Sequence, residues 1–230
     1  MSKADKIIIA TIKSWNINNA KGFCAHYPGI NARLITNNKR LSYKTVSSFK
    51  PRYIFLPHWS WMIDEKIYKN YECVLFHLGD LPFARGGSPL QNLIERGYKK
   101  TKITAFLADK AVDSGSVYLK RSINLSGSAS EIFKRTSSII FNDMIPYIIK
   151  NNPQPKPQKG ETVVFKRRRP GQSNIANLKN ISKVYDYIRM LDAEGYPAAY
   201  LNTGNLNIEF KGAKLKNGYI LAQAKIEVKK

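Results

Sequence analysis

A histidine and a carboxylate that follow two expected strands are the residues of this sequence best suited to moving a proton. His77 ends the apolar run at residues 73–77, and Asp113 lies in the turn after residues 102–107. The carboxyl ends of strands in an open α/β sheet are where ligands are bound. A carboxylate near an imidazole orients the ring and stabilises its protonated form. The two residues therefore predict a site for general acid–base catalysis.

The elements that must position these residues are short β-branched runs alternating with helical stretches. We expect strands over residues 6–12, 53–56, 73–77, 102–107 and 117–120. A helix should run from the Gly86-Gly87 turn to Gly97, and another should begin at the capping pair Ser128 and Glu131 and end near Lys150. This alternation predicts an α/β fold, with a Rossmann-like, mostly parallel sheet flanked by helices.

The chain changes character after the second of these helices. Residues 151–162 are rich in Pro, Gln and Lys, and the prolines lack the backbone N–H that a helix needs. We expect a catalytic domain over residues 1–150, a linker over 151–162 and a small β-rich C-terminal subdomain over 163–230. In the last, Val184, Ile188 and Leu191 share one helix face, and Asn217-Gly218 predicts a hairpin between strands that alternate at period two.

The composition describes a folded chain with a large positive charge. Hydrophobic residues make up 43 %, enough for a core, while 38 Lys and Arg against 16 Asp and Glu leave a formal charge of +22. Such a field attracts nucleic acid, a membrane surface or a small polyanion, or it reflects only a Lys-rich surface. Apolar runs are too short to cross a bilayer, no cleavable leader is evident, and Cys24 and Cys73 make no disulfide framework or metal site. We therefore expect a cytoplasmic protein.

Several motifs carry a family resemblance. Residues 77–89 read HLGDLPFARGGSP, residues 111–115 read AVDSG, and residues 55–61 read FLPHWSW. In order and spacing these resemble the folate-dependent formyltransferase family. Beyond the linker, residues 166–170 (KRRRP) and 196–199 (YPAA) resemble the members that formylate nucleotide-linked amino sugars.

The resemblance implies a reaction and its residues. An amine attacks the formyl carbon of N10-formyltetrahydrofolate, and the resulting tetrahedral intermediate loses tetrahydrofolate. His77 matches the proton acceptor, Asp113 its partner, and Arg85 a substrate-binding residue. The loops that match the folate site contain Trp59, Ser60, Trp61, Ala108, Asp109, Lys110 and Val112. Trp59 and Trp61 form a flat wall for the pterin ring or pack in the core, alternatives that the sequence leaves open.

One position departs from the family pattern. The family has Asn two residues before the histidine, where this chain has Leu75. A leucine donates no hydrogen bond to a developing oxyanion, so another group must substitute or the protein is slow. Asn92 is one replacement to consider, although its place on the expected helix also suits a solvent contact.

Three functions follow from these observations. The first is an N-formyltransferase for a nucleotide-linked amino-deoxy sugar in lipopolysaccharide O-antigen biosynthesis, with no nucleic-acid partner and with homodimer formation left open. The second is formylation of methionine on a charged initiator tRNA, which the +22 charge favours but which we rank lower because the chain has little room for a tRNA-binding insertion. The third is a non-catalytic anion-binding relative.

Overall fold

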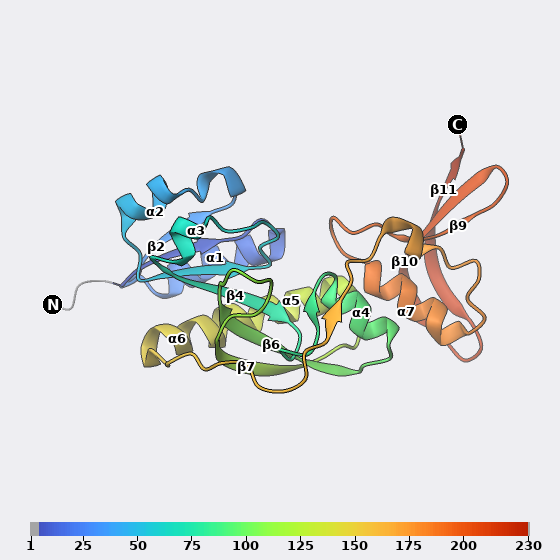
Figure 1. Ribbon diagram of the computed structural model, residues 1–230. Helices are drawn as coiled ribbons and strands as arrows, with labels where there is room; N and C mark the ends of the chain where they lie inside the picture. The colour runs from blue at the N-terminus through green and yellow to red at the C-terminus, as the bar shows by residue number, and fades with distance from the viewer. Residues whose placement is uncertain (1–4, 230) are drawn as a thin grey trace. The chain divides into compact units, whose positions relative to one another are not determined.

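A six-stranded sheet organises the first part of the protein in the computed structural model, which describes residues 5–229 (Figure 1). Its strands are β1 (Lys6–Ala10), β2 (Asn31–Ile35), β3 (Tyr53–Pro57), β4 (Glu72–Leu78), β6 (Lys100–Leu107) and β7 (Val117–Asn124), in the order β2-β1-β3-β4-β6-β7. β1 pairs in parallel with β2 and β3, and β3 with β4, whereas β4 and β6 are antiparallel. The expected α/β fold with a mostly parallel sheet is confirmed.

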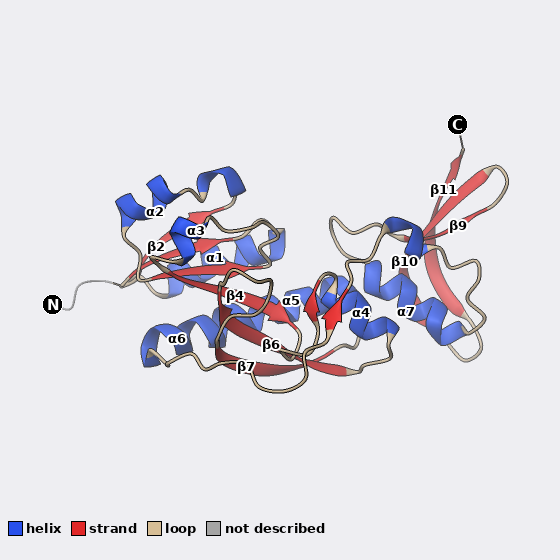
Figure 2. Cartoon of the chain, viewed as in Figure 1, coloured by secondary structure: helices blue, strands red, loops and turns tan. Residues whose placement is uncertain are grey.

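The central strands are apolar throughout because helices cover both faces of the sheet. On one face, Ile8, Ile54, Leu56 and Cys73 join Val46 and Phe49 of α2 (Tyr43–Phe49) and Ile67 of α3 (Glu65–Tyr68) in a core cluster. Figure 2 shows α2 and α3 on the same side of these strands. Neighbouring strand residues such as Ile7 and Phe55 point to the opposite face and are also fully buried.

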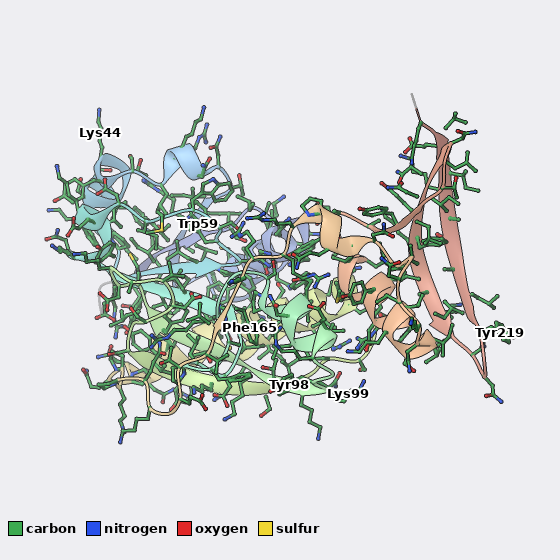
Figure 3. The ribbon with its side chains drawn as sticks, turned by 45° about the vertical axis from the view of Figure 1, so that its right-hand side comes forward. Lys44, Trp59, Tyr98, Lys99, Phe165 and Tyr219 are labelled. Carbon is green, nitrogen blue, oxygen red and sulfur yellow. The ribbon has the colours of Figure 1, made fainter. Side chains whose placement is uncertain are left out.

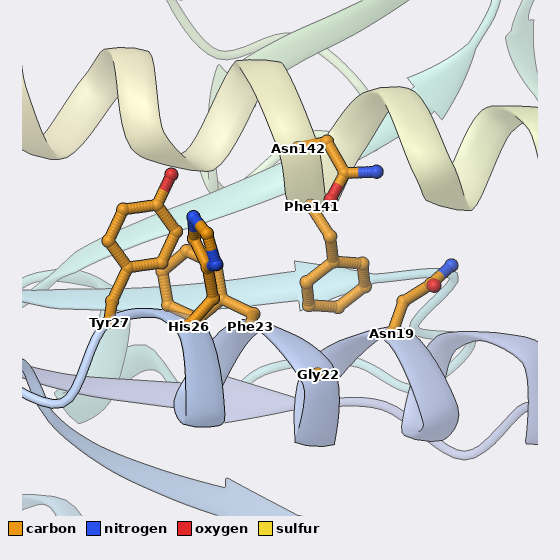
Figure 4. Close-up of a pocket in the computed structure, with 7 residues that line it drawn as sticks. All are labelled: Asn19, Gly22, Phe23, His26, Tyr27, Phe141 and Asn142. Carbon is orange, nitrogen blue, oxygen red and sulfur yellow. The ribbon is translucent and has the colours of Figure 1, made fainter.

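The helices α5 (Ala129–Ile139) and α6 (Ile145–Asn151) are joined by a π-helical turn, η2 (Ile140–Met144). The expected cap is present, since the Glu131 N–H donates to Ser128 Oγ and the Ser128 N–H donates to the Glu131 carboxylate. Across η2, the ring of Phe141 lies 6.4 Å from that of Phe23 in α1 (Ser14–His26). A pocket of about 360 Å³ opens beside this contact, between α1 and η2 (Figure 4).

The contacts divide the chain into two compact units. The first holds residues 5–85, 102–123 and 134–164, and the second holds residues 86–101, 124–133 and 165–229. The second contains α4 (Pro89–Glu95), α7 (Ile181–Leu191) and a sheet of β9 (Ala199–Asn202), β10 (Leu206–Leu215) and β11 (Ile220–Val228). Short elements complete the chain: η1 (Asn38–Arg40), β5 (Arg85–Gly86), β8 (Val164–Phe165) and η3 (Pro170–Ser173).

The C-terminal hairpin has the register that the alternation predicts. Ile208 pairs with Ile226 and Phe210 with Ala224, so the apolar residues share one face. Gly218 has a φ of 82°, the backbone conformation for which glycine is suited. The β-rich C-terminal subdomain is thereby confirmed as part of the fold.

The Pro-rich segment belongs to the first unit and is bound to β7 and to the loop after β6. Lys156 exchanges two backbone hydrogen bonds with Val117 of β7, at 2.7 and 2.9 Å. Two residues later, Gln158 hydrogen-bonds to the loop that follows β6. The domain bounds at 150 and 163 stay a prediction.

No helix within residues 5–229 combines the length and the apolar character needed to cross a membrane. The cytoplasmic location expected from the sequence stays a prediction.

Candidate active site

The imidazole of His77 lies between two oxygen atoms at the end of β4. Its Nδ1 is 3.5 Å from Oδ2 of Asp113, and its Nε2 is 2.6 Å from the backbone carbonyl oxygen of Ala84. The side chains of His77 and Asp113 are only 8 % and 14 % exposed, so water screens the pair weakly. The structure therefore brings together the two residues from which the sequence predicted acid–base chemistry, and their catalytic roles stay a prediction.

The turn that carries Asp113 is fixed by its neighbours. Asp113 has a φ of 55°, a left-handed conformation that Asp adopts more readily than most residues. Gly115 then passes so close to β6 that an added Cβ would lie 1.9 Å from the carbonyl oxygen of Leu107. Glycine is required there, and the close approach holds the Asp113 carboxylate against the end of the sheet.

The loop between His77 and Arg85 is tied to β6 and β7. Thr104 of β6 donates from its hydroxyl to the carbonyl of Gly79 at 2.6 Å, in a buried position. Asp80 forms ion pairs with Lys102 and Lys120, at 2.9 and 2.6 Å. Partial burial by itself would raise the pKa of Asp80, but the hydrogen bonds from these lysines lower it below the ordinary value. The carboxylate therefore stays charged and keeps the loop on the sheet.

Arg85 hydrogen-bonds to Gln158, a residue that the sequence analysis did not identify. Nε and Nη2 of Arg85 donate to Oε1 of Gln158 at 3.1 and 2.7 Å. The amide nitrogen of Gln158 in turn donates to the carbonyls of Asp113 and Gly115 at 2.8 and 2.9 Å. Gln158 therefore braces the turn that presents Asp113. A substrate-binding role for Arg85 stays a prediction.

The two expected folate loops differ in burial. Trp59 is half-buried against the core cluster, as is Ala108, whereas Ser60, Trp61, Asp109, Lys110 and Val112 are exposed. The rings of Trp59 and Trp61 meet edge to face, with centroids 5.1 Å apart and planes at 63°, so they form a corner and not a flat wall. The indole N–H of Trp59 is buried and has no hydrogen-bond partner among the described residues.

His58, which follows β3, packs beside an aromatic ring. Its backbone has a φ of 53°, and its ring lies 5.7 Å from that of Trp15. Burial, followed by the nearby charge of Lys13, lowers the pKa of His58 from 6.5 to about 4. The residue is therefore neutral at physiological pH and packs beside the Trp59 loop.

The depressed pKa of His58 predicts an acid-sensitive fold. Between pH 6.5 and about 4 the unfolded chain binds a proton at this residue that the folded chain does not, so the free energy of unfolding falls as the pH falls. We expect this residue to make the protein about 2 kcal/mol less stable at pH 5 than at pH 7. Urea unfolding at the two pH values should show a smaller difference for His58→Asn, because Asn also adopts positive φ. The same change at the exposed His26 should leave the difference as it is, and equal behaviour of the two variants would contradict the assignment.

Comparison with known proteins places this site in a family. Residues 170–227 match the family model described as methionyl-tRNA formyltransferase, C-terminal domain. The solved methionyl-tRNA formyltransferase from Clostridium thermocellum is 51 % identical to this chain, with a TM-score of 0.96, and the match covers 98 % of this chain and 100 % of that one. The chain belongs to the formyltransferase family.

More distant members of the formyltransferase family share less. A curated methionyl-tRNA formyltransferase from Bacillus cytotoxicus is 25 % identical over 166 residues, which are 69 % of this chain and 52 % of the relative. The chain thus spans about half the length of the curated relatives it matches. A sugar N-formyltransferase from Shewanella is 14 % identical with a TM-score of 0.68, covering 87 % of this chain and 93 % of that one. The last likeness shows the fold alone.

These comparisons correct the expected specificity. The expectation of a nucleotide-linked amino sugar as substrate, of O-antigen biosynthesis as context and of no nucleic-acid partner is wrong. It rested on the likeness of residues 166–170 and 196–199 to sugar-modifying members, whereas residues 170–227 match the methionyl-tRNA formyltransferase model. It also rested on the argument that a chain of this length has no room to handle tRNA. A protein named methionyl-tRNA formyltransferase that this chain covers from end to end shows that the argument from length does not hold.

The position where the formyltransferase family has Asn is apolar here. Leu75 pairs in register with Leu56 of β3 and Phe106 of β6, and it packs on the core cluster. The suggestion that Asn92 supplies the missing amide finds no support, because its Nδ2 donates to the backbone carbonyls of Gly87, Ser88 and Lys166, each at 3.0 Å. Asn92 instead holds together the backbone of the second unit.

Proposed function

We propose that this protein transfers a formyl group from N10-formyltetrahydrofolate to the amino group of methionine on charged initiator tRNA. The observation that carries the reaction type is the approach of His77 Nδ1 to the Asp113 carboxylate at the carboxyl end of β4. The choice of acceptor is supported by the 51 % identity to a methionyl-tRNA formyltransferase along its whole length.

His77 and Asp113 divide the proton chemistry between them. The imidazole accepts the proton that the attacking amine loses, and the carboxylate stabilises the imidazolium that results. Both groups are nearly buried, so their interaction is stronger than it would be at the surface. General-base catalysis of this kind is typically worth about 10²- to 10⁴-fold in rate.

Trp59 carries a buried donor that suits a bound folate. Its indole N–H lacks an acceptor among residues 5–229, and a buried donor without one costs about 1–3 kcal/mol, which an acceptor atom of a heterocycle would offset once the loop opens to it. We assign the loops with Trp59, Ser60 and Trp61 and with Ala108, Asp109, Lys110 and Val112 to the folate, whose contribution when bound is the formyl carbon.

The charge of the chain suits a polyanionic acceptor. The formal charge is +22, and many of its lysines are exposed; Lys44 and Lys99 point away from the backbone in Figure 3. Neutralising phosphates with such side chains releases counterions, which makes affinity depend steeply on salt. The same charge would not help a small neutral amine.

A transfer assay tests the proposal. Purified protein with N10-formyltetrahydrofolate and methionyl-tRNA should give formylmethionine after the aminoacyl ester is hydrolysed, while free methionine should react far more slowly. The kcat/KM for the charged tRNA should fall steeply as salt rises from 50 to 200 mM, by about 10³-fold if some six phosphates are contacted. Absence of formylmethionine at any salt concentration would overturn the proposal, and folate binding without transfer would identify a non-catalytic relative.

A further inference from the structure

We infer that the backbone carbonyl of Ala84 fixes the tautomer of His77, so that Nε2 carries the proton and Nδ1 is the nitrogen that accepts one. A carbonyl oxygen can only accept a hydrogen bond, and it lies 2.6 Å from Nε2. The opposite tautomer would place two lone pairs at that distance. This inference rests on the proposed function only for its catalytic consequence, and the tautomer itself can be measured without activity.

The carbonyl of Ala84 is held in place by the backbone around it. Ala84 has a φ of 67° and a fully buried side chain, and its carbonyl oxygen contacts the ring of His77. A positive φ is costly for alanine and persists only where surrounding contacts enforce it. The lysine ties to Asp80 and the hydroxyl of Thr104 are such contacts.

Gly79 lies against the ring of His77, where only glycine fits. A Cβ added there would lie 2.8 Å from Cδ2 of His77, 3.0 Å from Nε2 and 3.1 Å from the Cβ of Ala84. The imidazole therefore packs directly on Gly79, where a larger residue would displace it, and the contact of Nε2 with the Ala84 carbonyl favours one orientation of the ring. Because Thr104 donates to the carbonyl of Gly79 at 2.6 Å, this residue of β6 positions the support beneath the ring.

The fixed tautomer leaves Nδ1 of His77 as the nitrogen that can accept a proton. In the neutral ring Nδ1 presents a lone pair, 3.5 Å from Oδ2 of Asp113. As the amine nitrogen bonds to the formyl carbon, its N–H bond breaks and the proton binds Nδ1; when the intermediate loses tetrahydrofolate, the bond from carbon to N10 breaks and the proton passes to the leaving nitrogen. While the ring is protonated, its positive charge lies beside the Asp113 carboxylate, 3.5 Å from Nδ1. Thr104, Gly79 and Ala84 are thus positioning residues that act through His77.

Nitrogen-15 NMR of histidine-labelled protein tests the tautomer. The chain has three histidines, so the signals of His77 are those lost in His77→Gln. At a pH where the ring is neutral, we expect a protonated, pyrrole-like Nε2 and an unprotonated, pyridine-like Nδ1. Thr104→Val should mix the two patterns, whereas Thr104→Ser, which keeps the hydroxyl, should restore the pattern of the unmodified protein. A His77 protonated on Nδ1 in the unmodified protein would overturn the inference.

Kinetics test the consequence for catalysis. Thr104→Val and Gly79→Ala should lower kcat by about 10- to 100-fold with little change in KM, since small misplacements of reacting groups cost rate more than binding. Thr104→Ser should recover most of the loss, and Thr104→Val should add nothing in a His77→Gln background. An unchanged NMR pattern together with unchanged kcat in Thr104→Val would overturn the positioning role. If the tautomer is as inferred and no formyl transfer occurs in any variant, the proposed function fails and the tautomer assignment stands.

Discussion

Replacing His77 with Gln is expected to lower kcat for formyl transfer by about 10²- to 10⁴-fold while the KM for methionyl-tRNA changes little. The Gln side chain can still donate to the Ala84 carbonyl, so the loop keeps its contact. It cannot accept a proton at neutral pH, so the amine must lose its proton to water. Steady-state kinetics with saturating folate measures this effect directly.

Asp113→Asn provides the matched comparison for His77→Gln. Asn adopts the left-handed conformation of Asp113 and keeps its size, but it does not stabilise an imidazolium. We expect a large loss in kcat and nearly the same rate when both substitutions are combined, because residues that act as a unit are not additive. Multiplicative losses in the double variant would show that the two residues act separately.

Replacing Leu75 with Asn is expected to raise kcat by up to about 10²-fold. The family pattern places an amide donor at this position, and losing one oxyanion donor typically costs on the order of 10²- to 10³-fold. Leu75 lies on the same face of β4 as His77, two residues away, so its side chain is on the correct side of the sheet. The measurement is the single-turnover rate with saturating tRNA and folate.

Leu75→Ala separates the new donor from the loss of bulk. Both variants remove packing from the core cluster, so both should unfold at lower urea concentration than the unmodified protein. Only the Asn variant gains a hydrogen-bond donor. Equal rates in the Asn and Ala variants would show that the missing amide is supplied elsewhere or that the oxyanion does not form near this strand.

The sequence predicted the strands whose burial, on one or both faces of the sheet, gives a recognisable apolar pattern. β1, β3 and β4 are apolar on both faces, and the capping pair at Ser128 and Glu131 marks a helix start. β2 (Asn31–Ile35) escaped prediction because it lies at the sheet edge, where most of its residues stay partly exposed. α1 (Ser14–His26) was also not predicted, because its sequence is rich in Asn and has little amphipathic pattern.

The sequence predicted only those parts of the site that are formed by distinctive side chains. His77 and Asp113 stand out by type and by their place after strands, and the structure puts them 3.5 Å apart. The carbonyl of Ala84 left no trace in the sequence, since every residue has one. Gln158 was overlooked because it lies in a Pro-rich stretch that composition describes as a linker. The acceptor was misjudged because short C-terminal likenesses and the length of the chain were weighed above the +22 charge.

The hydrogen bonds of Gln158 determine the shortest fragment of the chain in which the site stays aligned. A fragment that stops where the last helix of the first unit ends, at Asn151, would keep the whole sheet and both reacting side chains. It would lack the amide that joins Arg85 to the backbone of Asp113 and Gly115. Shortened versions made for expression or crystallisation should therefore extend beyond residue 158, or the carboxylate will lose its alignment although the fold survives.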